Sequence, residues 1–257
     1  MIYIKTPQEI EIMAEGGHIL SGILDKVGKE IKPGVTTGFL DEFAENLIIE
    51  KNGISAFKNY RDRADEQPFP TTLCASINEE IVHAPAKPSR RLKTGDIIGV
   101  DIGMQYKGYF TDMARTFPVG KISRDASRLL KITKKALELG IKQVKPGNYI
   151  SDISKTIQNF VEKNGYSVVR ALVGHGVGKY VHEPPAVPNF ILKKNHTEMV
   201  MLKQGMTIAI EPMVNIGEYQ VDVLDDGWTA VTKDGSLSAH FEHSVAVTDK
   251  GNLVLTK

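Results

Sequence analysis

The fold is decided by residues 97–117, which read IIGVDIGMQYKGYFTDMARTF. Two segments rich in Ile, Val, Tyr, Phe and Thr, residue types that favour strands, lie on either side of residues 105–108, QYKG. The pattern predicts an antiparallel hairpin. Each of its strands carries one aspartate within an otherwise apolar run, Asp101 in the first and Asp112 in the second.

The spacing of these two aspartates places them on one face of the hairpin. A loop of two or four residues pairs positions whose numbers have an odd sum, and 101 and 112 fulfil that condition, so the side chains are opposite or diagonal neighbours. Like charges across a ladder are destabilising, and strands disfavour Asp, so a divalent cation between the carboxylates would offset both effects. In the alternative interpretation one aspartate is a turn residue and the other caps a loop.

Helical patterns lie on both sides of the hairpin, in two pairs. The predicted helices cover residues 6–31, 37–51, 126–144 and 150–163. Short strands are predicted after the second pair, at residues 168–172, 207–214 and 244–247. The order of helix pair, strands, helix pair and strands favours an α+β body of two similar halves around a shared sheet, although the halves show no obvious sequence repeat.

Composition narrows the class of protein. The 257 residues include 32 Lys and Arg against 31 Asp and Glu, and a net charge of +1 argues against direct binding to nucleic acid or to an anionic membrane surface. No apolar run approaches the roughly 20 residues that span a bilayer, and the amino terminus has no export signal. The single cysteine excludes an intrachain disulfide and fits a cytoplasmic location. We expect one domain over residues 1–257.

Three further segments add candidate metal ligands. They are GHGVGKYVHEPP at 174–185, with His175 and His182, IAIEPMV at 208–214, with Glu211, and HFEHSVAV at 240–247, with Glu242. A glutamate in an apolar strand is costly to bury unless it is paired or bound to metal. Asp101, Asp112, His175, Glu211 and Glu242 form a mainly carboxylate set that suits two hard or borderline divalent ions. Such a pair of ions lowers the pKa of water and polarises a carbonyl group, which predicts hydrolysis of an amide or ester.

The other histidines and the cysteine are weaker candidates. We expect His18 to be a surface or packing residue of the first helix, and His196 and His240 stay undecided. His243 follows Glu242 and points to the opposite face of its strand, which makes it a poorer ligand. Nothing in the sequence marks Cys74 as an activated thiolate rather than a small buried hydrophobe, so we reject cysteine catalysis.

Five motifs in chain order carry a family resemblance. They are NEEIVHAP, GVDIGMQYKGYFTDMART, GHGVGKYVHEPPAVPNF, IAIEPMV and AHFEHSVAVT. With them the chain resembles the type I methionine aminopeptidases over essentially its whole length. The resemblance implies a single catalytic peptidase domain with the pita-bread fold, in which helix pairs lie outside a curved antiparallel sheet and the two halves are pseudo-symmetric. It also implies a cytoplasmic monomer that removes the N-terminal methionine from nascent polypeptides at the ribosome when the second residue is small.

The resemblance assigns a role to each candidate residue. The same five residues would bind two divalent metal ions per chain, which could be cobalt, manganese, iron or zinc. His182 and His83 would bind the substrate and act in catalysis: His182 hydrogen-bonds the scissile carbonyl as the oxyanion forms, and His83 contacts the peptide amide. Glu211 would also accept a proton and pass it to the leaving amine. A pocket for the methionine side chain would lie near Cys74, Phe69 and Trp228.

The sequence departs from the family pattern at several positions, and two alternative functions stay open. Ala84 replaces a common Gly, Val181 a common Phe and His240 a common Gln, and residues 61–67 and 195–199 resemble insertions. A proline-specific aminopeptidase of the same fold would share the five ligands but normally carries an extra amino-terminal domain. A non-catalytic peptide-binding relative would lack ligands, and none is missing.

Overall fold

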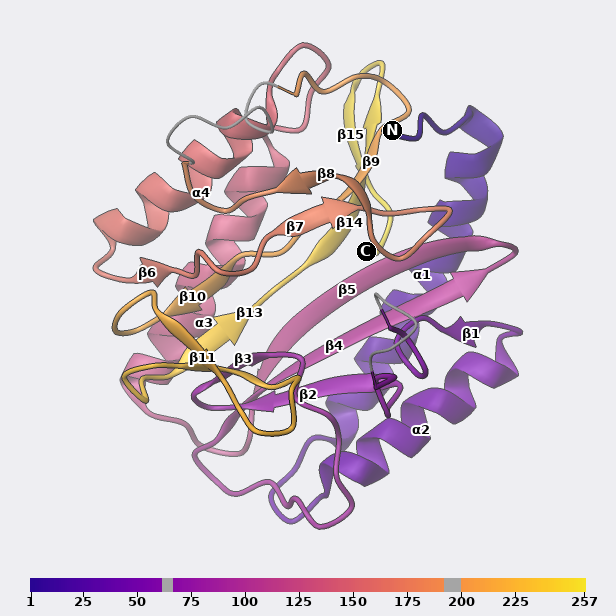
Figure 1. The fold of residues 1–257 in the computed structure, drawn as a ribbon. Coiled ribbons are helices and arrows are strands. Elements are labelled where there is room, and N and C mark those ends of the chain that lie inside the picture. The colour runs from indigo at the N-terminus through magenta and orange to yellow at the C-terminus, as the bar shows by residue number, and fades with distance from the viewer. Residues whose placement is uncertain (62–66, 192–199) are drawn as a thin grey trace.

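The computed structural model describes residues 1–61, 67–191 and 200–257. The insertion predicted at 195–199 and His196 lie outside the described residues, as does most of the insertion predicted at 61–67. Helices lie on the outside of the molecule and strands run between them, with one helix pair beside each half of the strand layer (Figure 1). Among the described residues, no helix combines the length and apolar composition needed to cross a membrane.

The first helix pair forms as predicted, with α1 at Pro7–Glu30 and α2 at Thr37–Glu50. A capping box begins α1: the Glu9 N–H donates to Thr6 Oγ1 over 3.2 Å, and the Thr6 N–H donates to Glu9 Oε2 over 2.7 Å. Leu20 and Leu24 of α1 are fully buried in one apolar cluster with Leu40 of α2. The helix pair therefore covers the N-terminal half of the strand layer.

The predicted hairpin consists of β4 (Ile97–Tyr106) and β5 (Tyr109–Pro118). Lys107 and Gly108 form its two-residue turn, and both have positive φ, at 49° and 86°. Asp101 lies opposite Ala114, and Asp112 lies opposite Gly103, so the two aspartates are diagonal neighbours on one face. The other side of β4 pairs with the short β1 (Ile54–Ser55) and with β2 (Leu73–Ile77).

The second helix pair, α3 (Arg124–Ile141) and α4 (Ile150–Lys163), also forms as predicted. The helices approach closely at Gly140, where a Cβ atom would lie 2.8 Å from Ile157 Cδ1. Beside them lies a five-stranded antiparallel sheet. Its strands in spatial order are β15 (Gly251–Val254), β14 (His243–Thr248), β9 (Thr207–Ile210), β7 (Gly174–Gly176) and β8 (Glu183–Val187).

Two of the predicted strands were wrong in extent. The strand predicted at 168–172 ends after β6 (Ser167–Val168). The strand predicted at 207–214 is divided into β9 and β10 (Met213–Asn215), because Pro212 has no N–H with which to continue a ladder. The segment 211–212 therefore bends between two sheets. The described residues form four further strands. β13 (Ser238–His240) pairs with β10, and β3 (Glu80–Val82), β12 (Ala230–Thr232) and β11 (Val221–Val223) form a separate sheet.

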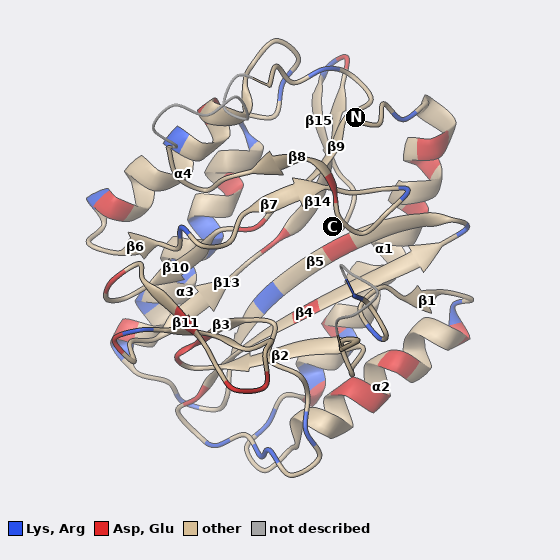
Figure 2. Ribbon diagram, viewed as in Figure 1, with Lys and Arg blue, Asp and Glu red and all other residues tan. Residues whose placement is uncertain are grey.

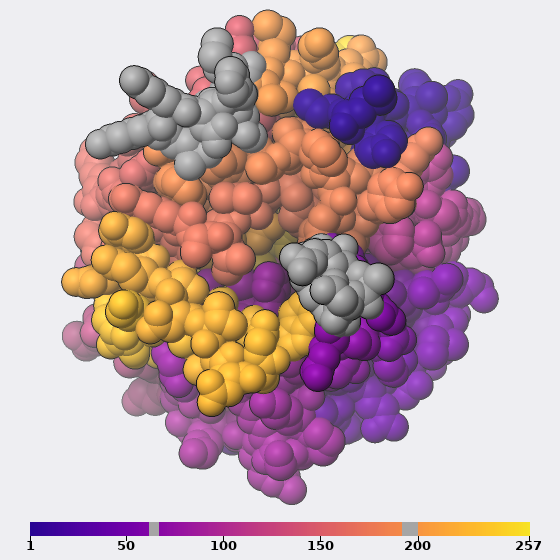
Figure 3. Space-filling model, in the orientation of Figure 1, coloured from indigo at the N-terminus to yellow at the C-terminus, as the bar shows by residue number. Residues whose placement is uncertain are grey.

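The two halves meet along β5, which lies beside β13 and β14 (Figure 1). The Asp112 N–H donates to Ser244 Oγ over 2.9 Å, and the Ser244 hydroxyl donates to the Asp112 carbonyl over 2.8 Å. The Glu242 N–H donates to the Ala114 carbonyl over 2.9 Å. Two of the candidate ligands thus lie on the seam that joins the halves. Figure 3 shows a recess at the centre of this face, between purple, orange and gold segments.

Candidate metal and catalytic site

One pocket brings together all five candidate metal ligands. Asp101 comes from β4, Asp112 from β5, His175 from β7, Glu211 from the end of β9 and Glu242 from the start of β14. In Figure 2, acidic positions lie on β4 and β5 in the middle of the molecule, whereas many other charged positions lie on outer helices and loops. The same pocket is lined by Phe57, Tyr60, Phe69, Cys74, His83, His182 and Trp228.

The acids of this cluster are buried and close to one another. Ligand atoms of Asp112, His175 and Glu242 all lie within 4.8 Å of each other. His175 Nε2 lies 3.5 Å from Glu211 Oε1. The exposed fraction of Asp112 is 3% and that of Glu242 is 2%. Such a concentration of acid in a low-dielectric pocket is unfavourable without a compensating positive charge.

The donor atoms fit a divalent cation. Asp101 Oδ1, Asp112 Oδ1 and Glu242 Oε1 are buried and have no hydrogen-bond partner within the described part of the chain. Burial raises the pKa of Asp101 to about 7. Burial first, and then the neighbouring acids, raise the pKa values of Asp112, Glu211 and Glu242 well above their usual range. The metal-free cluster therefore retains protons that a bound cation would displace.

His175 has the protonation state of a metal ligand. Its Nδ1 lies 2.9 Å from the Gly176 carbonyl, which can only accept, so Nδ1 carries the proton and Nε2 presents its lone pair toward Glu211. Burial lowers the pKa of His175 to about 4, so the imidazole is neutral near pH 7. A neutral imidazole among carboxylates is a donor set for borderline divalent ions.

His182 and His83 lie on the wall of the same pocket. The His182 ring packs edge-on against the His175 ring with 4.5 Å between centroids, and its Nδ1 lies 2.7 Å from the Tyr60 hydroxyl. His83 directly follows β3 and has φ of 60°, a left-handed conformation that is uncommon for a residue with a side chain. Backbone strain of this kind concentrates at functional sites.

An apolar recess adjoins the acids. Phe69 and Trp228 meet edge to face, with 5.3 Å between ring centroids. Cys74 lies opposite Asp101 in the β2–β4 ladder, and burial, together with Asp101 and Asp112, raises the pKa of its thiol well above the usual value. The thiol is therefore protonated, in agreement with the rejection of cysteine catalysis.

Sequence reasoning missed several residues of the site or left them undecided. Tyr60 was not considered, and its 122-residue separation from His182 gives no local signal. His240 was undecided, and its Nε2 lies buried at 3.6 Å from Glu211 Oε2 and 4.0 Å from Glu242 Oε2. Burial lowers its pKa to about 3, so it is neutral. The available signal was a histidine two residues before Glu242, the spacing at which side chains of an extended segment point the same way.

The two histidines that were expected to lie elsewhere do so. His243 Nδ1 lies 2.9 Å from Thr256 Oγ1, outside the pocket lining. His18 is exposed on α1, with Nδ1 at 2.9 Å from the Lys257 carbonyl.

Two of the departures from the family pattern change the surroundings of the site and leave its ligands unchanged. Ala84 is fully buried directly after His83, and Val181 packs in the apolar cluster of Phe69 and Cys74.

Buried carboxylates, a neutral imidazole and an adjoining apolar recess define a metal-dependent hydrolase, and comparison with known proteins identifies its family. Residues 11–249 match the model of metallopeptidase family M24, to which the chain therefore belongs. Its full-length similarity within that family is to the methionine aminopeptidases. The methionine aminopeptidase of Clostridium acetobutylicum is 46% identical over 256 residues, which cover 100% of this chain and 99% of that protein.

Solved structures agree with this placement. The crystal structure of methionine aminopeptidase from Thermotoga maritima matches with a TM-score of 0.94 and 41% identity, and the match covers 100% of both chains. Xaa-Pro dipeptidase from Bacillus anthracis matches with a TM-score of 0.77 and 23% identity, covering 99% of this chain but 62% of that one. The second likeness concerns the fold alone. The predicted α+β pita-bread fold is confirmed, and the family and the acidic cluster together show that the chain uses divalent metal.

Proposed function

We propose that the chain hydrolyses the peptide bond after an N-terminal methionine when the second residue is small. We further propose that Asp101, Asp112, His175, Glu211 and Glu242 hold two divalent metal ions for this reaction. The observation that carries the proposal is the convergence of four acids, three of them buried, and a neutral imidazole beside an apolar recess. Several of the acid oxygens have no partner in the described part of the protein, which supports a cation between them.

The ligand types are compatible with manganese, iron, cobalt and zinc, so metal availability decides among these ions. When bound, such ions lower the pKa of water and polarise the scissile carbonyl. Glu211 is suited to move the proton, because its side chain is 12% exposed toward the pocket whereas that of Glu242 is only 2% exposed. In this mechanism Glu211 accepts a proton from the attacking water and delivers it to the leaving amine.

His182 has the geometry of an oxyanion donor. The Tyr60 hydroxyl lies 2.7 Å from His182 Nδ1, and when it donates to that atom the imidazole proton resides on Nε2. The Nε2–H can then donate to the carbonyl oxygen as negative charge develops on it. His83 would contact the amide of the same peptide bond from the loop after β3. Both histidines therefore act as substrate-binding and catalytic residues in this proposal.

The apolar recess would hold the methionine side chain. Phe69 and Trp228 offer ring faces and edges to a thioether, and sulfur–aromatic contacts of this kind are favourable. The buried Asp101 is one of the carboxylates near which the free N-terminal amine of the substrate would lie. Selection for a small second residue follows if the pocket rim leaves little room beyond the scissile bond.

We also propose the wider setting of this activity. The substrates would be N-termini of nascent polypeptides at the ribosome, and residues 1–257 would act as one catalytic domain, as a monomer, in the cytoplasm. The single, buried cysteine supports a reducing compartment. The near-neutral net charge supports a substrate that is recognised by its terminus rather than by its charge.

A peptide panel tests the proposal. Chelator-treated protein is incubated with Met-Ala-Ser, Leu-Ala-Ser and Ala-Pro-Ser while each divalent metal is added back, and the released residue is quantified. We expect metal-dependent release from the methionine peptide alone. Cleavage before proline would instead favour a proline-specific aminopeptidase, and metal binding without turnover would favour a peptide-binding relative.

A further inference from the structure

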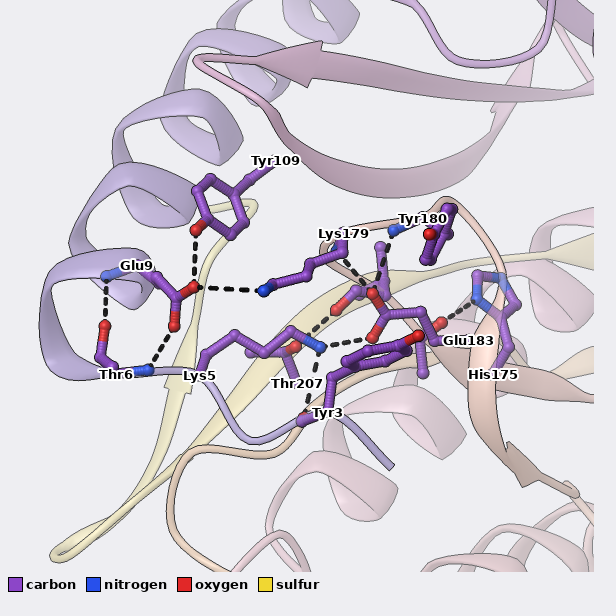
Figure 4. A network of polar contacts seen from close by, with 12 residues as sticks. Tyr3, Lys5, Thr6, Glu9, Tyr109, His175, Lys179, Tyr180, Glu183 and Thr207 are labelled. Carbon is purple, nitrogen blue, oxygen red and sulfur yellow. Dashed lines mark hydrogen bonds and ion pairs between the residues drawn. The ribbon is translucent and has the colours of Figure 1, made fainter. Parts of the chain in front are cut away.

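A buried ion pair lies outside the pocket and joins two distant parts of the chain. Lys5 precedes α1, Glu183 begins β8, and the Lys5 ammonium group contacts Glu183 Oε2 (Figure 4). The Lys5 side chain is 1% exposed and that of Glu183 is 0% exposed. Lys5 Nζ has a second acceptor in the Tyr3 carbonyl, at 3.4 Å. Burying two charges is unfavourable unless the polar atoms of both are matched, so such a pair indicates a specific structural role.

The second oxygen of Glu183 binds the backbone of the preceding turn. Glu183 Oε1 accepts hydrogen bonds from the N–H groups of Lys179 and Tyr180, the latter over 3.0 Å. One carboxylate thus connects the ammonium group of the N-terminal segment to the turn formed by residues 177–182 (Figure 4). The N-terminal segment is itself held in place, because the Lys5 N–H donates to the Gly205 carbonyl over 2.7 Å.

This turn carries His182 at its end. It links β7, which contains His175, to β8. The turn also contacts the β4–β5 hairpin, because the Phe110 N–H donates to the Gly178 carbonyl over 2.6 Å. Gly178 has φ of 152°, and a Cβ atom there would collide with Lys5 Cε. The Lys5 side chain therefore packs directly on the turn backbone, at a position that only glycine permits.

We propose that Lys5 is a positioning residue for His182, acting through Glu183 and the turn of residues 177–182. The inference rests on the proposed function, because it takes His182 to be a catalytic residue whose orientation the Lys5–Glu183 ion pair fixes. Without the ammonium group, Glu183 is a buried charge with one oxygen unmatched, and the turn must shift to bring it water or a proton. A shift of about 1 Å in His182 would suffice to lower turnover severely.

The variants that test this inference separate charge from packing. Lys5→Met keeps most of the side-chain volume and removes the charge, Glu183→Gln removes the partner charge, and the double variant removes both. Lys107→Met is the matched control, because Lys107 forms a solvent-exposed ion pair with Glu15 at 2.7 Å. We expect Lys5→Met to retain its metal content and to lose about tenfold in kcat with little change in KM. The control should keep full activity.

The coupling to His182 and Glu183 is measured with double variants. In a His182→Ala background, Lys5→Met should lower kcat by less than about twofold, because the residue through which it acts is already absent. Equal losses in both backgrounds would refute a role through His182. The Lys5→Met/Glu183→Gln variant buries no unpaired charge, so it should fold even where Lys5→Met does not. Its kcat should stay within about twofold of that of the unmodified chain, and a loss of about tenfold or more would refute the role of the unmatched Glu183 charge.

Hydrogen exchange supplies a readout that needs no activity. In the metal-free protein, the amides of Lys179 and Tyr180 should exchange about tenfold faster in Lys5→Met than in the unmodified chain or in Lys107→Met. Unchanged protection of these amides would overturn the inference about Lys5. Absence of turnover by the unmodified chain with every metal would overturn the proposed function instead, so the two failures can be told apart.

Discussion

The substitution Asp112→Asn should raise the free energy of unfolding of the metal-free protein and lower that of the metal-loaded protein. Asp112 shares its pocket with Asp101, Glu211 and Glu242, and its ligand atom lies within 4.8 Å of that of Glu242. Two unit charges at that distance repel by about 3 kcal/mol at an effective dielectric constant near 20. Retained protons relieve part of this repulsion, so we expect Asp112→Asn to stabilise the metal-free protein by about 1–3 kcal/mol. Each kcal/mol corresponds to about 2–4 °C in Tm for a chain of this size.

Metal should reverse the order of stability. At a free metal concentration about a hundredfold above Kd, binding to the folded state adds about 2.7 kcal/mol to the unmodified protein. Asp112→Asn loses one charged ligand oxygen, so its Tm should change little on metal addition, and its metal content and turnover should fall together. Asp222→Asn, at an exposed position of β11, is the control and should behave as the unmodified chain in both states.

Thermal unfolding followed by far-UV dichroism, with and without chelator, measures these changes, and elemental analysis gives the metal content. Full metal content with full activity in Asp112→Asn would refute the ligand assignment. A lower Tm in the metal-free variant would refute the repulsion argument, because it would mean that the Asp112 carboxylate stabilises the fold without a cation.

Four further outcomes are expected. His182→Ala should keep its metals, by elemental analysis, while kcat falls by about 10²–10³ from loss of an oxyanion donor. His240→Leu should weaken metal binding about 10–100-fold in a metal titration, whereas His240→Gln, which retains a donor beside Glu211, should weaken it less. Leu24→Ala should lower the free energy of unfolding by about 2–5 kcal/mol in a denaturant titration, with kcat unchanged where the protein is folded. Asp101 should lower metal-free stability as pH rises from about 4 to 7, because burial raises its pKa from 3.8 to about 7 and the folded chain then binds this proton more tightly than the unfolded chain. The contribution is measured as the difference in Tm between the unmodified chain and Asp101→Asn, and a difference that does not change with pH would contradict it.

Local signals were sufficient for the elements that frame the site. The start of the first helix near Thr6 and the hairpin connection within residues 105–108 depend on residues within a few positions of each other, and both predictions are confirmed. The shared face of Asp101 and Asp112 followed from the two-residue period of a strand, which the register confirms. The structure also brings the five candidate ligands into one pocket, although their roles stay predictions.

Long-range pairing could not be read from the chain. The pairing of β3 with β12 joins residues about 150 positions apart, and the Lys5–Glu183 pair spans 178. Neither contact has a periodic or turn signal of its own, because it depends on how whole elements pack. The break at Pro212 was visible in the sequence, and it was missed because the apolar run around it has the composition of one strand.

The five candidate ligands are divided between the two halves of the chain, so the site depends on how the halves dock along β5. Asp101 and Asp112 belong to the N-terminal hairpin, whereas His175, Glu211 and Glu242 belong to the C-terminal half, so neither half holds the full set. The mutual hydrogen bonds of Asp112 and Ser244 fix the two sets relative to each other without metal. A cation bound across the seam would favour only the arrangement in which both halves are folded and docked. Its stabilisation should therefore extend to the whole chain, and α1 and α3 should gain protection from hydrogen exchange together when metal is added.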